Sequence, residues 1–420
     1  MLTYYFKKPL LAPVFLAAIF TLVGFYSCTK DNVGGPPVIE KIRVTNPALK
    51  DSVFDRALPG TFLVIEGRNL ANAQKVLFNG MPAYFNPAYN SSTHIFVQIP
   101  AETPTPDLYP DVTNTITVVT SAGEVAYNFT IVPPPPLIQL VNNENPLAGE
   151  QITITGMYFH SVKEVNFPGG LKGTNIQKND AGTQLTVNAP AGLTNATGPG
   201  KLELVSEYGN AKTIYDVNKI SGPGVISNLD DVWNYSWPNS GEIEMMPGLY
   251  PNSHGKYLRW VVGPLPHNDN TWWNKYRGSH FAGTPQILEA GDNGGSADSY
   301  ALKFEVNTRN WNKDLTVRIS FNEGAYSYTF APHLDYPDLK FNTNGKWITY
   351  TIPLNLFKVP KDEYGDYVPS GANMSSVKDI LDAEGKLKQN FYLRNKTIWQ
   401  VPLTETVDLA FDNFRIVKIK

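Results

Sequence analysis

A short segment after residue 271 combines two neighbouring tryptophans with side chains that hydrogen-bond well. Trp272 and Trp273 are followed by Asn274, Tyr276 and Arg277, in a polar, turn-rich setting. Adjacent indoles cannot both point into one core from a strand, so at least one is expected to be exposed. An exposed aromatic ring offers an apolar surface to the C–H face of a sugar, while amide and guanidinium groups hydrogen-bond its hydroxyls. The segment therefore predicts a sugar-binding surface.

The other tryptophans divide into one further candidate and several structural residues. All eight tryptophans lie beyond residue 219. Trp311 stands between polar residues and is interpreted as a second exposed loop aromatic of the same surface. Trp260 and Trp347 stand in alternating, strand-like segments and are expected in the core, whereas Trp233 and Trp237 fit either role. The candidate binding residues are therefore Trp272, Trp273, Tyr276, Trp311, Asn274 and Arg277.

Carboxylates keep catalysis open as an alternative. A glycoside hydrolase needs two carboxyl groups about 5 to 9.5 Å apart. Acidic residues are frequent after residue 220, but Glu305 lies in an alternating strand and none stands in a recognisable hydrolase motif. The six histidines show no metal-binding spacing, and there is no nucleophile elbow or phosphate loop. We expect binding without catalysis, with no metal and no cofactor.

Residues 292–298 form a tight turn that is rich in oxygen ligands. Such a turn could hold a structural Ca²⁺ ion. The spacing of a complete calcium loop is missing, so a solvated hairpin is the favoured interpretation.

Two copies of one module precede the tryptophan-rich part, over residues 37–133 and 134–219. Apolar and polar residues alternate in each copy, and Gly or Asn-Gly closes the runs, as strands and hairpins require. This pattern predicts an immunoglobulin-like β-sandwich for each copy. We expect residues 220–420 to form a larger, jelly-roll-like β-sandwich, so that the chain is all-β. At one constant offset, Gly60, Gly67, Val76, Phe78 and Gly80 align with Gly149, Gly156, Val165, Phe167 and Gly169.

The N-terminus has the order of a lipoprotein signal. A basic pair and an apolar run from Leu10 to Tyr26 precede Ser27 and Cys28, the only cysteine. No basic stop-transfer flank follows the run. We expect residues 1–27 to be removed, Cys28 to carry lipid and residues 28–36 to form a flexible tether, so the protein would sit on a membrane by its lipid alone. An ordinary cleaved signal or a transmembrane anchor is the alternative.

Composition narrows the compartment and the partners. A formal net charge of −3 argues against a nucleic-acid partner, which would require a clustered basic surface. One cysteine allows no intramolecular disulfide, which suits a bacterial envelope. The run Pro133 to Pro136 predicts a stiff, polyproline-like linker between the two copies.

The repeats resemble the IPT/TIG immunoglobulin-like family. The resemblance rests on Leu63–Leu70 and Ile152–Phe159, which share the order Leu/Ile-x-Ile-x-Gly-x-x-Leu/Phe, and on the Val-x-Phe-x-Gly hairpin that follows each. Domains of this family are mostly spacers or interaction modules. The resemblance therefore implies no chemistry for residues 37–219.

The whole chain after the signal resembles the surface glycan-binding proteins of Bacteroidota polysaccharide-utilisation systems. The C-terminal strands 301–306, 347–354 and 409–416 have the signatures of glycan-binding modules. The resemblance implies a non-catalytic, lipid-anchored protein on the outside of the outer membrane, beside a glycan importer complex. Its ligand would be a plant-type polysaccharide such as xyloglucan, mixed-linkage glucan or a mannan. An adhesin that uses the same aromatic residues to bind a protein is a further alternative.

Overall fold

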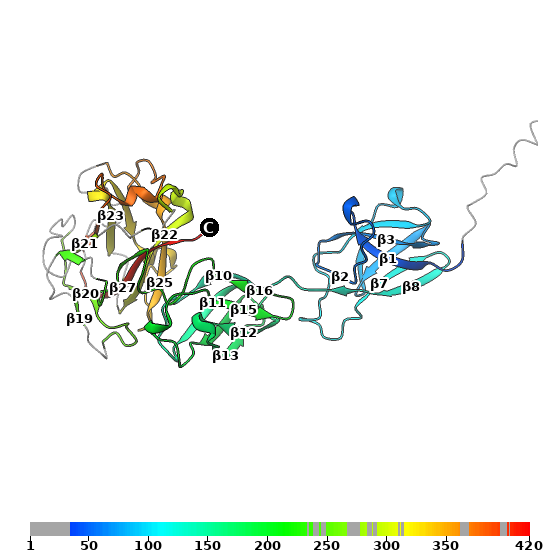
Figure 1. The fold of residues 1–420 in the computed structure, drawn as a ribbon, viewed down its shortest axis with the longest axis horizontal. Helices are drawn as coiled ribbons and strands as arrows, with labels where there is room; N and C mark the ends of the chain where they lie inside the picture. The colour runs from blue at the N-terminus through cyan, green and yellow to red at the C-terminus, as the bar shows by residue number, and fades with distance from the viewer. Residues whose placement is uncertain are drawn as a thin grey trace, which may run out of the picture. The chain divides into compact units, whose positions relative to one another are not determined.

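The computed structural model divides the chain into two compact units, Met1–Pro134 and Pro135–Lys420, with the break inside the proline run. It describes residues 34–232, 235–237, 243–244, 249–266, 278–283, 288, 292–309, 311, 315–361, 369–394, 401–402 and 404–420. Their regular structure consists of strands and short 3-10 helices (Figure 1), which confirms the expected all-β class. None of the helices among these residues is long and apolar enough to cross a bilayer.

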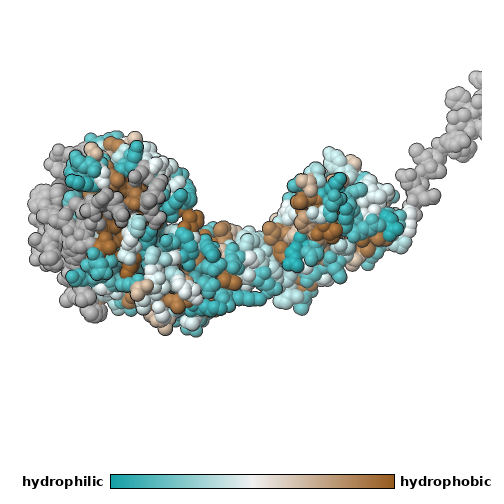
Figure 2. Space-filling view, viewed as in Figure 1, coloured by the Kyte–Doolittle hydropathy of each residue, from teal (hydrophilic) through white to brown (hydrophobic). Residues whose placement is uncertain are grey.

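The first unit is an immunoglobulin-like β-sandwich. One sheet has the order β1-β3-β6 and the other β5-β4-β7-β8, and β2 pairs with β9 in parallel. Hydrophilic residues cover most of the face shown in Figure 2, with small hydrophobic patches between them. The strands are β1 (Val38–Val44), β2 (Arg56–Ala57), β3 (Phe62–Arg68), β4 (Ala73–Phe78), β5 (Met81–Ala83), β6 (His94–Gln98), β7 (Thr115–Thr120), β8 (Gly123–Asn128) and β9 (Thr130–Ile131).

The second unit begins with the second copy of this sandwich. Its sheets have the orders β10-β11-β14-β13 and β12-β15-β16, so β11, β12, β14 and β15 correspond to β3, β4, β6 and β7. The aligned residues Val76, Phe78, Val165 and Phe167 are all buried, as the alternation predicts. The strands are β10 (Leu137–Val141), β11 (Gln151–Met157), β12 (Val162–Asn166), β13 (Thr174–Lys178), β14 (Gln184–Asn188), β15 (Glu203–Ser206) and β16 (Gly209–Lys212).

The glycine of the repeated motif is required by a close backbone approach. A Cβ atom on Gly67 would lie 1.9 Å from the carbonyl oxygen of Val38, and one on Gly156 would lie 1.9 Å from that of Leu137. Both contacts occur where the neighbouring first strand bulges. A side chain cannot fit there, because bulged backbone closes the space.

The rest of the second unit is a larger sandwich of two facing sheets, the C-terminal domain. One sheet has the order β19-β20-β27-β22-β25, with β17 also paired to β27, and the other has the order β18-β21-β26-β23-β24. The strands are β17 (Val225–Ser227), β18 (Tyr235–Trp237), β19 (Ile243–Glu244), β20 (Tyr257–Val262), β21 (Gly278–Gly283), β22 (Tyr300–Thr308), β23 (Thr316–Phe321), β24 (Tyr326–Phe330), β25 (Ile348–Pro353), β26 (Leu387–Arg394) and β27 (Val407–Lys418).

Short 3-10 helices link the strands of all three sandwiches. Each is only three or four residues long. They are Pro47–Leu49, Pro87–Tyr89, Pro168–Gly170, Asn195–Thr197, Asp292–Gly294, Ala297–Ser299, Asn322–Gly324, Pro332–Asp335, Leu354–Leu356 and Val377–Ile380.

The strand β22 is buried along its whole length. Its alternate residues Leu302, Phe304 and Val306 contribute to the core between the two sheets. The opposite face carries Lys303 and Glu305, which are also buried, because the second immunoglobulin-like copy packs there. The C-terminal domain and the second copy therefore share one compact unit.

Candidate functional site

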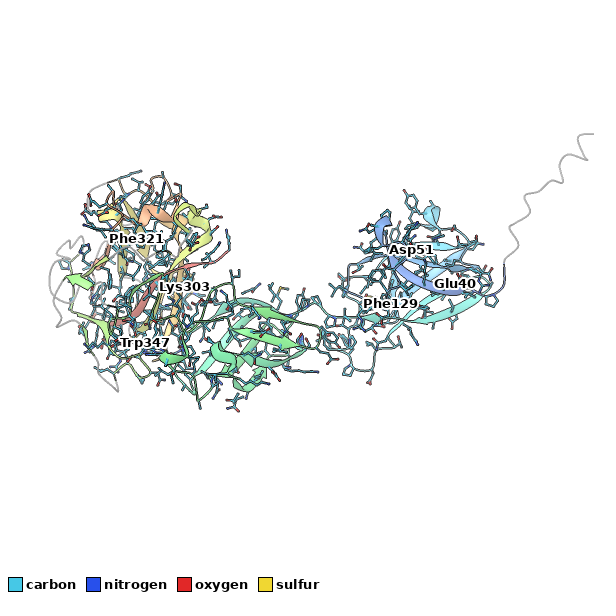
Figure 3. The ribbon with its side chains drawn as sticks, in the orientation of Figure 1. Glu40, Asp51, Phe129, Lys303, Phe321 and Trp347 are labelled. Carbon is cyan, nitrogen blue, oxygen red and sulfur yellow. The ribbon has the colours of Figure 1, made fainter. Side chains whose placement is uncertain are left out.

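Five connections leave and re-enter the C-terminal domain at one end. The register pairs the end of β20 with the start of β27, at Val262 and Val407, and the end of β22 lies beside them. In the facing sheet the start of β21 pairs with the end of β26, and the start of β23 pairs with the ends of β26 and β24. Figure 3 shows the two ends: Trp347, just before β25, lies at this end, and Phe321, the last residue of β23, lies at the other.

The five connections follow one another in a fixed order. Each connection joins a strand of one sheet to the strand at the same position in the order of the other sheet. From the first position to the fifth, the connections are 238–242, 263–277, 395–406, 309–315 and 331–347. We call this set the loop row. Neighbouring strands are about 4.8 Å apart, so β20 and β25, three places apart, are separated by roughly 14 Å.

Most of the predicted binding residues fall in the second member of the loop row. Trp272, Trp273, Asn274, Tyr276 and Arg277 lie outside the described residues, as does Cys28. The structure places the strand ends on either side of them, Val262 in one sheet and Gly278 in the other. The chain thus leaves one sheet at Val262 and enters the facing sheet at Gly278.

The interpretation of Trp311 as an exposed aromatic is wrong. Its side chain is 1% exposed, and its indole Nε1 donates a hydrogen bond of 3.1 Å to the carbonyl oxygen of Leu315. Its ring meets Phe330 and Phe341 edge to face, with centroids 5.0 and 5.8 Å away. Trp311 therefore belongs to the core and offers no face to a ligand. Trp260 and Trp347 are also buried, as expected.

One exposed aromatic of the loop row escaped the sequence analysis. Tyr336 is 45% exposed and lies in the connection between β24 and β25. It stands before Pro337 and between Asp335 and Asp338. The polar, turn-rich sequence around Tyr336 could have indicated its exposure, as it did for Trp272. A single tyrosine is a weaker indication of a sugar-binding surface than two adjacent tryptophans.

Glu305, the acidic residue that the sequence analysis assigned to a strand, has a structural role. Both of its carboxylate oxygens accept hydrogen bonds from Arg415, Oε1 from Nη2 at 2.9 Å and Oε2 from Nη1 at 3.0 Å. Thr349 donates to Oε1 and Asn145 donates to Oε2. A buried carboxylate held by four donors is not free to act as an acid or a nucleophile.

Glu305 belongs to a buried ion network between the second copy and the C-terminal domain. Glu144, from the connection between β10 and β11, accepts hydrogen bonds from Lys303 and, at 3.0 Å, from Arg415. Burial lowers the pKa of Lys303, the charge of Arg415 lowers it further, and Glu144 opposes both effects. For Arg415, burial would lower the pKa, but the carboxylates of Glu305 and Glu144 raise it above its usual value. The pairing thus compensates for the removal of these charges from water.

Asp412 adds a second type of carboxyl group to this region. It is buried, and its Oδ1 accepts a hydrogen bond of 2.8 Å from the backbone N–H of Asn413. Burial, together with the nearby Glu305 carboxylate, raises the pKa of Asp412 well above its usual range. Burial and the neighbouring carboxylate both favour the neutral form of Asp412, because a second buried negative charge beside Glu305 would be costly.

The turn at residues 292–298 uses its carboxylates within the protein. Asp292 accepts a hydrogen bond of 2.7 Å from the hydroxyl of Tyr300, and Asp298 pairs with Lys420 at 3.1 Å. Within the part of the chain that the structure describes, no cluster of three or more His, Cys, Asp or Glu side chains is arranged to hold a metal.

Comparison with known proteins finds a family that is similar to the C-terminal domain. Residues 218–418 match the family model of the surface glycan-binding protein B xyloglucan-binding domain. The C-terminal domain is thus similar to this family along nearly its whole length. The loop row is the end of this domain at which β20 ends, at Val262, and β21 begins, at Gly278.

A curated protein and a solved structure are also similar to this chain. A curated IPT/TIG domain-containing protein from Bacteroides ovatus is 33% identical over 195 residues, which are 43% of this chain and 40% of that protein. The match thus spans well under half of the curated relative. The crystal structure of the surface glycan-binding protein PbSGBP-B from Prevotella bryantii has a TM-score of 0.64 at 19% identity, over 92% of this chain and 100% of that chain. The second likeness shows the same β-sandwich fold.

Proposed function

We propose that this protein binds a plant-type polysaccharide without cleaving it, with xyloglucan as the first candidate and mixed-linkage glucan and mannan next. The observation that carries the proposal is the match of residues 218–418 to a xyloglucan-binding domain family. The immunoglobulin-like copies then act as spacers between the C-terminal domain and the cell surface.

The sugar-binding surface of this proposal lies at the loop row. Trp272 or Trp273, with Tyr276, would stack on sugar rings, while Asn274 and Arg277 would hydrogen-bond the hydroxyls. This assignment is supported by the strand register, which puts the ends of β20 and β21 that flank the segment at one end of the two sheets. Binding residues on loops that a rigid scaffold carries are common in β-sandwich proteins.

A panel of polysaccharides tests this function. We expect the full chain from residue 29 to be retarded in native gels that contain xyloglucan, and to migrate normally in gels that contain an unrelated polymer such as a fructan. Isothermal titration with xyloglucan oligosaccharides then gives the affinity. A chain that binds none of the three candidate polymers would contradict the proposal.

The absence of cleavage needs its own measurement. The carboxylate of Glu305 is buried and accepts hydrogen bonds from Arg415 and Thr349. This argues against a catalytic role for Glu305. We expect no new reducing ends after long incubation of the purified protein with a polysaccharide that it binds. Turnover would instead support the hydrolase alternative.

The proposed location is the outer face of the outer membrane, with a lipid on Cys28 as the anchor and a glycan importer complex as the partner. The proposal is supported by the order of basic, apolar and small residues before Cys28. A cell-surface location fits the description of the domain family, whose name is that of surface glycan-binding proteins. Co-purification of an outer-membrane transporter with the lipidated protein would test the partner.

A further inference from the structure

The connection between β24 and β25 presents a small exposed patch at the edge of the C-terminal domain. It consists of Leu334, Asp335, Tyr336 and Asp338, and we call it the edge patch. Leu334 is 42% exposed and Tyr336 is 45% exposed. On either side of the patch the chain is anchored by buried residues, His333 before it and Phe341 after it.

Tyr336 packs against a chain of core aromatic rings. Its ring packs on Phe341 with centroids 6.0 Å apart and planes inclined by 37°. Phe341 in turn packs edge to face on Trp311, and its backbone N–H donates a hydrogen bond of 3.0 Å to the carbonyl oxygen of Trp311. Since Trp311 is fixed in the core, the position of Tyr336 is set before any ligand arrives, which lowers the entropic cost of binding.

Polar groups stand beside the exposed ring. The hydroxyl of Tyr350 donates to Asp335 Oδ2 at 3.3 Å, and Asp338 accepts a hydrogen bond from the backbone N–H of Lys340. Each carboxylate has further acceptor positions, since an ionised carboxyl group accepts about four hydrogen bonds. An aromatic face beside such acceptors is suited to a neutral sugar, which has an apolar face and donor hydroxyls.

The edge patch is attached to the last position of the loop row. It lies in the connection between β24 and β25, which are edge strands of their sheets. These strands are three positions away from β21 and β20. That separation corresponds to roughly 14 Å. A ligand that contacts both positions must be an extended chain of several sugars, whereas a short oligosaccharide reaches only one of them.

We propose that Tyr336 and the edge patch form a second sugar-contacting position, which binds a distant part of the same polysaccharide chain. This inference rests on the proposed function, because it assumes that the domain binds a neutral polysaccharide. It adds that affinity depends on chain length. Long chains gain the contact with Tyr336, and short ones do not.

The test compares Tyr336→Ala with the unaltered full chain from residue 29, by isothermal titration. The ligands are xyloglucan polymer and xyloglucan oligosaccharides of one, two and three repeat units. We expect the variant to lose about tenfold in affinity for the polymer, as for the removal of an aromatic anchor. Its affinity for the single-repeat oligosaccharide should stay within about twofold of the unaltered chain.

Two further variants separate binding from folding. Tyr336→Phe keeps the ring and should keep the affinity for the polymer. Tyr89→Ala removes a tyrosine that is 70% exposed on the first unit, and it should change nothing. Thermal melting of Tyr336→Ala close to that of the unaltered chain would show that the aromatic stack beneath it is intact.

The outcomes are distinguishable. If the unaltered chain binds xyloglucan and Tyr336→Ala binds the polymer equally well, the inference is overturned while the proposed function stands. An equal loss for all chain lengths also overturns it, because the residue would then act at the main position. If the unaltered chain binds none of the three candidate polymers, the proposed function fails, and the inference fails with it.

Discussion

Glu144 Oε2 accepts a hydrogen bond of 3.0 Å from Arg415 Nη2, although the two residues are 271 positions apart in the chain. The first belongs to the second immunoglobulin-like copy and the second to the last strand of the C-terminal domain. Around this contact, Asn145 reaches Glu305, and the backbone N–H of Thr349 donates to the carbonyl oxygen of Asn142 at 2.8 Å. Domain packing here depends on buried charges as well as on apolar surface.

We first predict that Glu144→Gln destabilises the protein strongly. The change leaves Lys303 and Arg415 buried with one carboxylate fewer, and breaking a buried ion pair costs about 3–5 kcal/mol. Urea unfolding, followed by tryptophan fluorescence, measures the loss. The control is Glu164→Gln in the same copy, whose ion pair with Lys172 is solvent-exposed and should contribute less than about 1 kcal/mol. Equal effects of the two substitutions would contradict the prediction.

The second prediction concerns truncation. A chain of residues 135–420 should unfold in a single transition and keep the full affinity for polysaccharide, because it retains the buried network. A chain of residues 220–420 lacks Glu144, so Lys303 and Arg415 lose that carboxylate, and it should melt at a lower temperature. Differential scanning calorimetry of both fragments measures this. The prediction fails if the shorter fragment is as stable as the longer one.

The third prediction separates binding tryptophans from core tryptophans. Replacement of Trp272 and Trp273 together by alanine should abolish polysaccharide binding and leave the melting temperature nearly unchanged. Trp311→Ala should instead lower the melting temperature. It removes a ring from the core and should cost about 3–5 kcal/mol of stability. Affinity gels and thermal melts on the same samples give both readouts. A double variant that fails to fold would show that residues 272 and 273 are core residues.

Acid should weaken the fold through His333. Burial lowers the pKa of His333 from 6.5 to about 4, with Asp335 acting in the opposite direction. The unfolded chain therefore binds more protons than the folded chain between these values, and stability falls as the pH drops from about 6.5 toward 4. We expect His333→Leu to reduce the fall in melting temperature between pH 7 and pH 5. His94→Gln, in the first unit, should leave the fall as it is; an unchanged slope in His333→Leu would refute the assignment.

The fifth prediction is the anchor. Cys28→Ala should move the protein from the outer-membrane fraction to a soluble fraction, since attachment would depend on acyl chains that each contribute about 0.8 kcal/mol per buried CH₂ group. Cell fractionation and immunoblotting measure the distribution. A protein that stays in the membrane fraction after this change would point to a different anchor.

Local sequence patterns predicted much of the fold because a strand with one buried face alternates in sequence. That rule placed Trp260 and Trp347 in the core correctly. It failed for Trp311, whose neighbours in sequence are polar, because its burial comes from Phe330 and Phe341, which are distant in the chain. The ion network could not be predicted for the same reason: no local pattern connects Glu144 with Arg415. The residues of the predicted sugar-binding segment stay a prediction.

The two immunoglobulin-like copies share a fold but are not interchangeable parts. In the first copy, 17 residues separate β1 from β3 and include a 3-10 helix and β2, whereas nine residues separate β10 from β11. The shorter connection carries Glu144 and Asn145, which are buried against the C-terminal domain. The contact with the C-terminal domain thus depends on a connection whose length and residues differ between the two copies. Recombination could therefore transfer the second copy and the C-terminal domain together into another protein. A chimaera joined between these two domains would lose the buried contacts of Glu144 and Asn145.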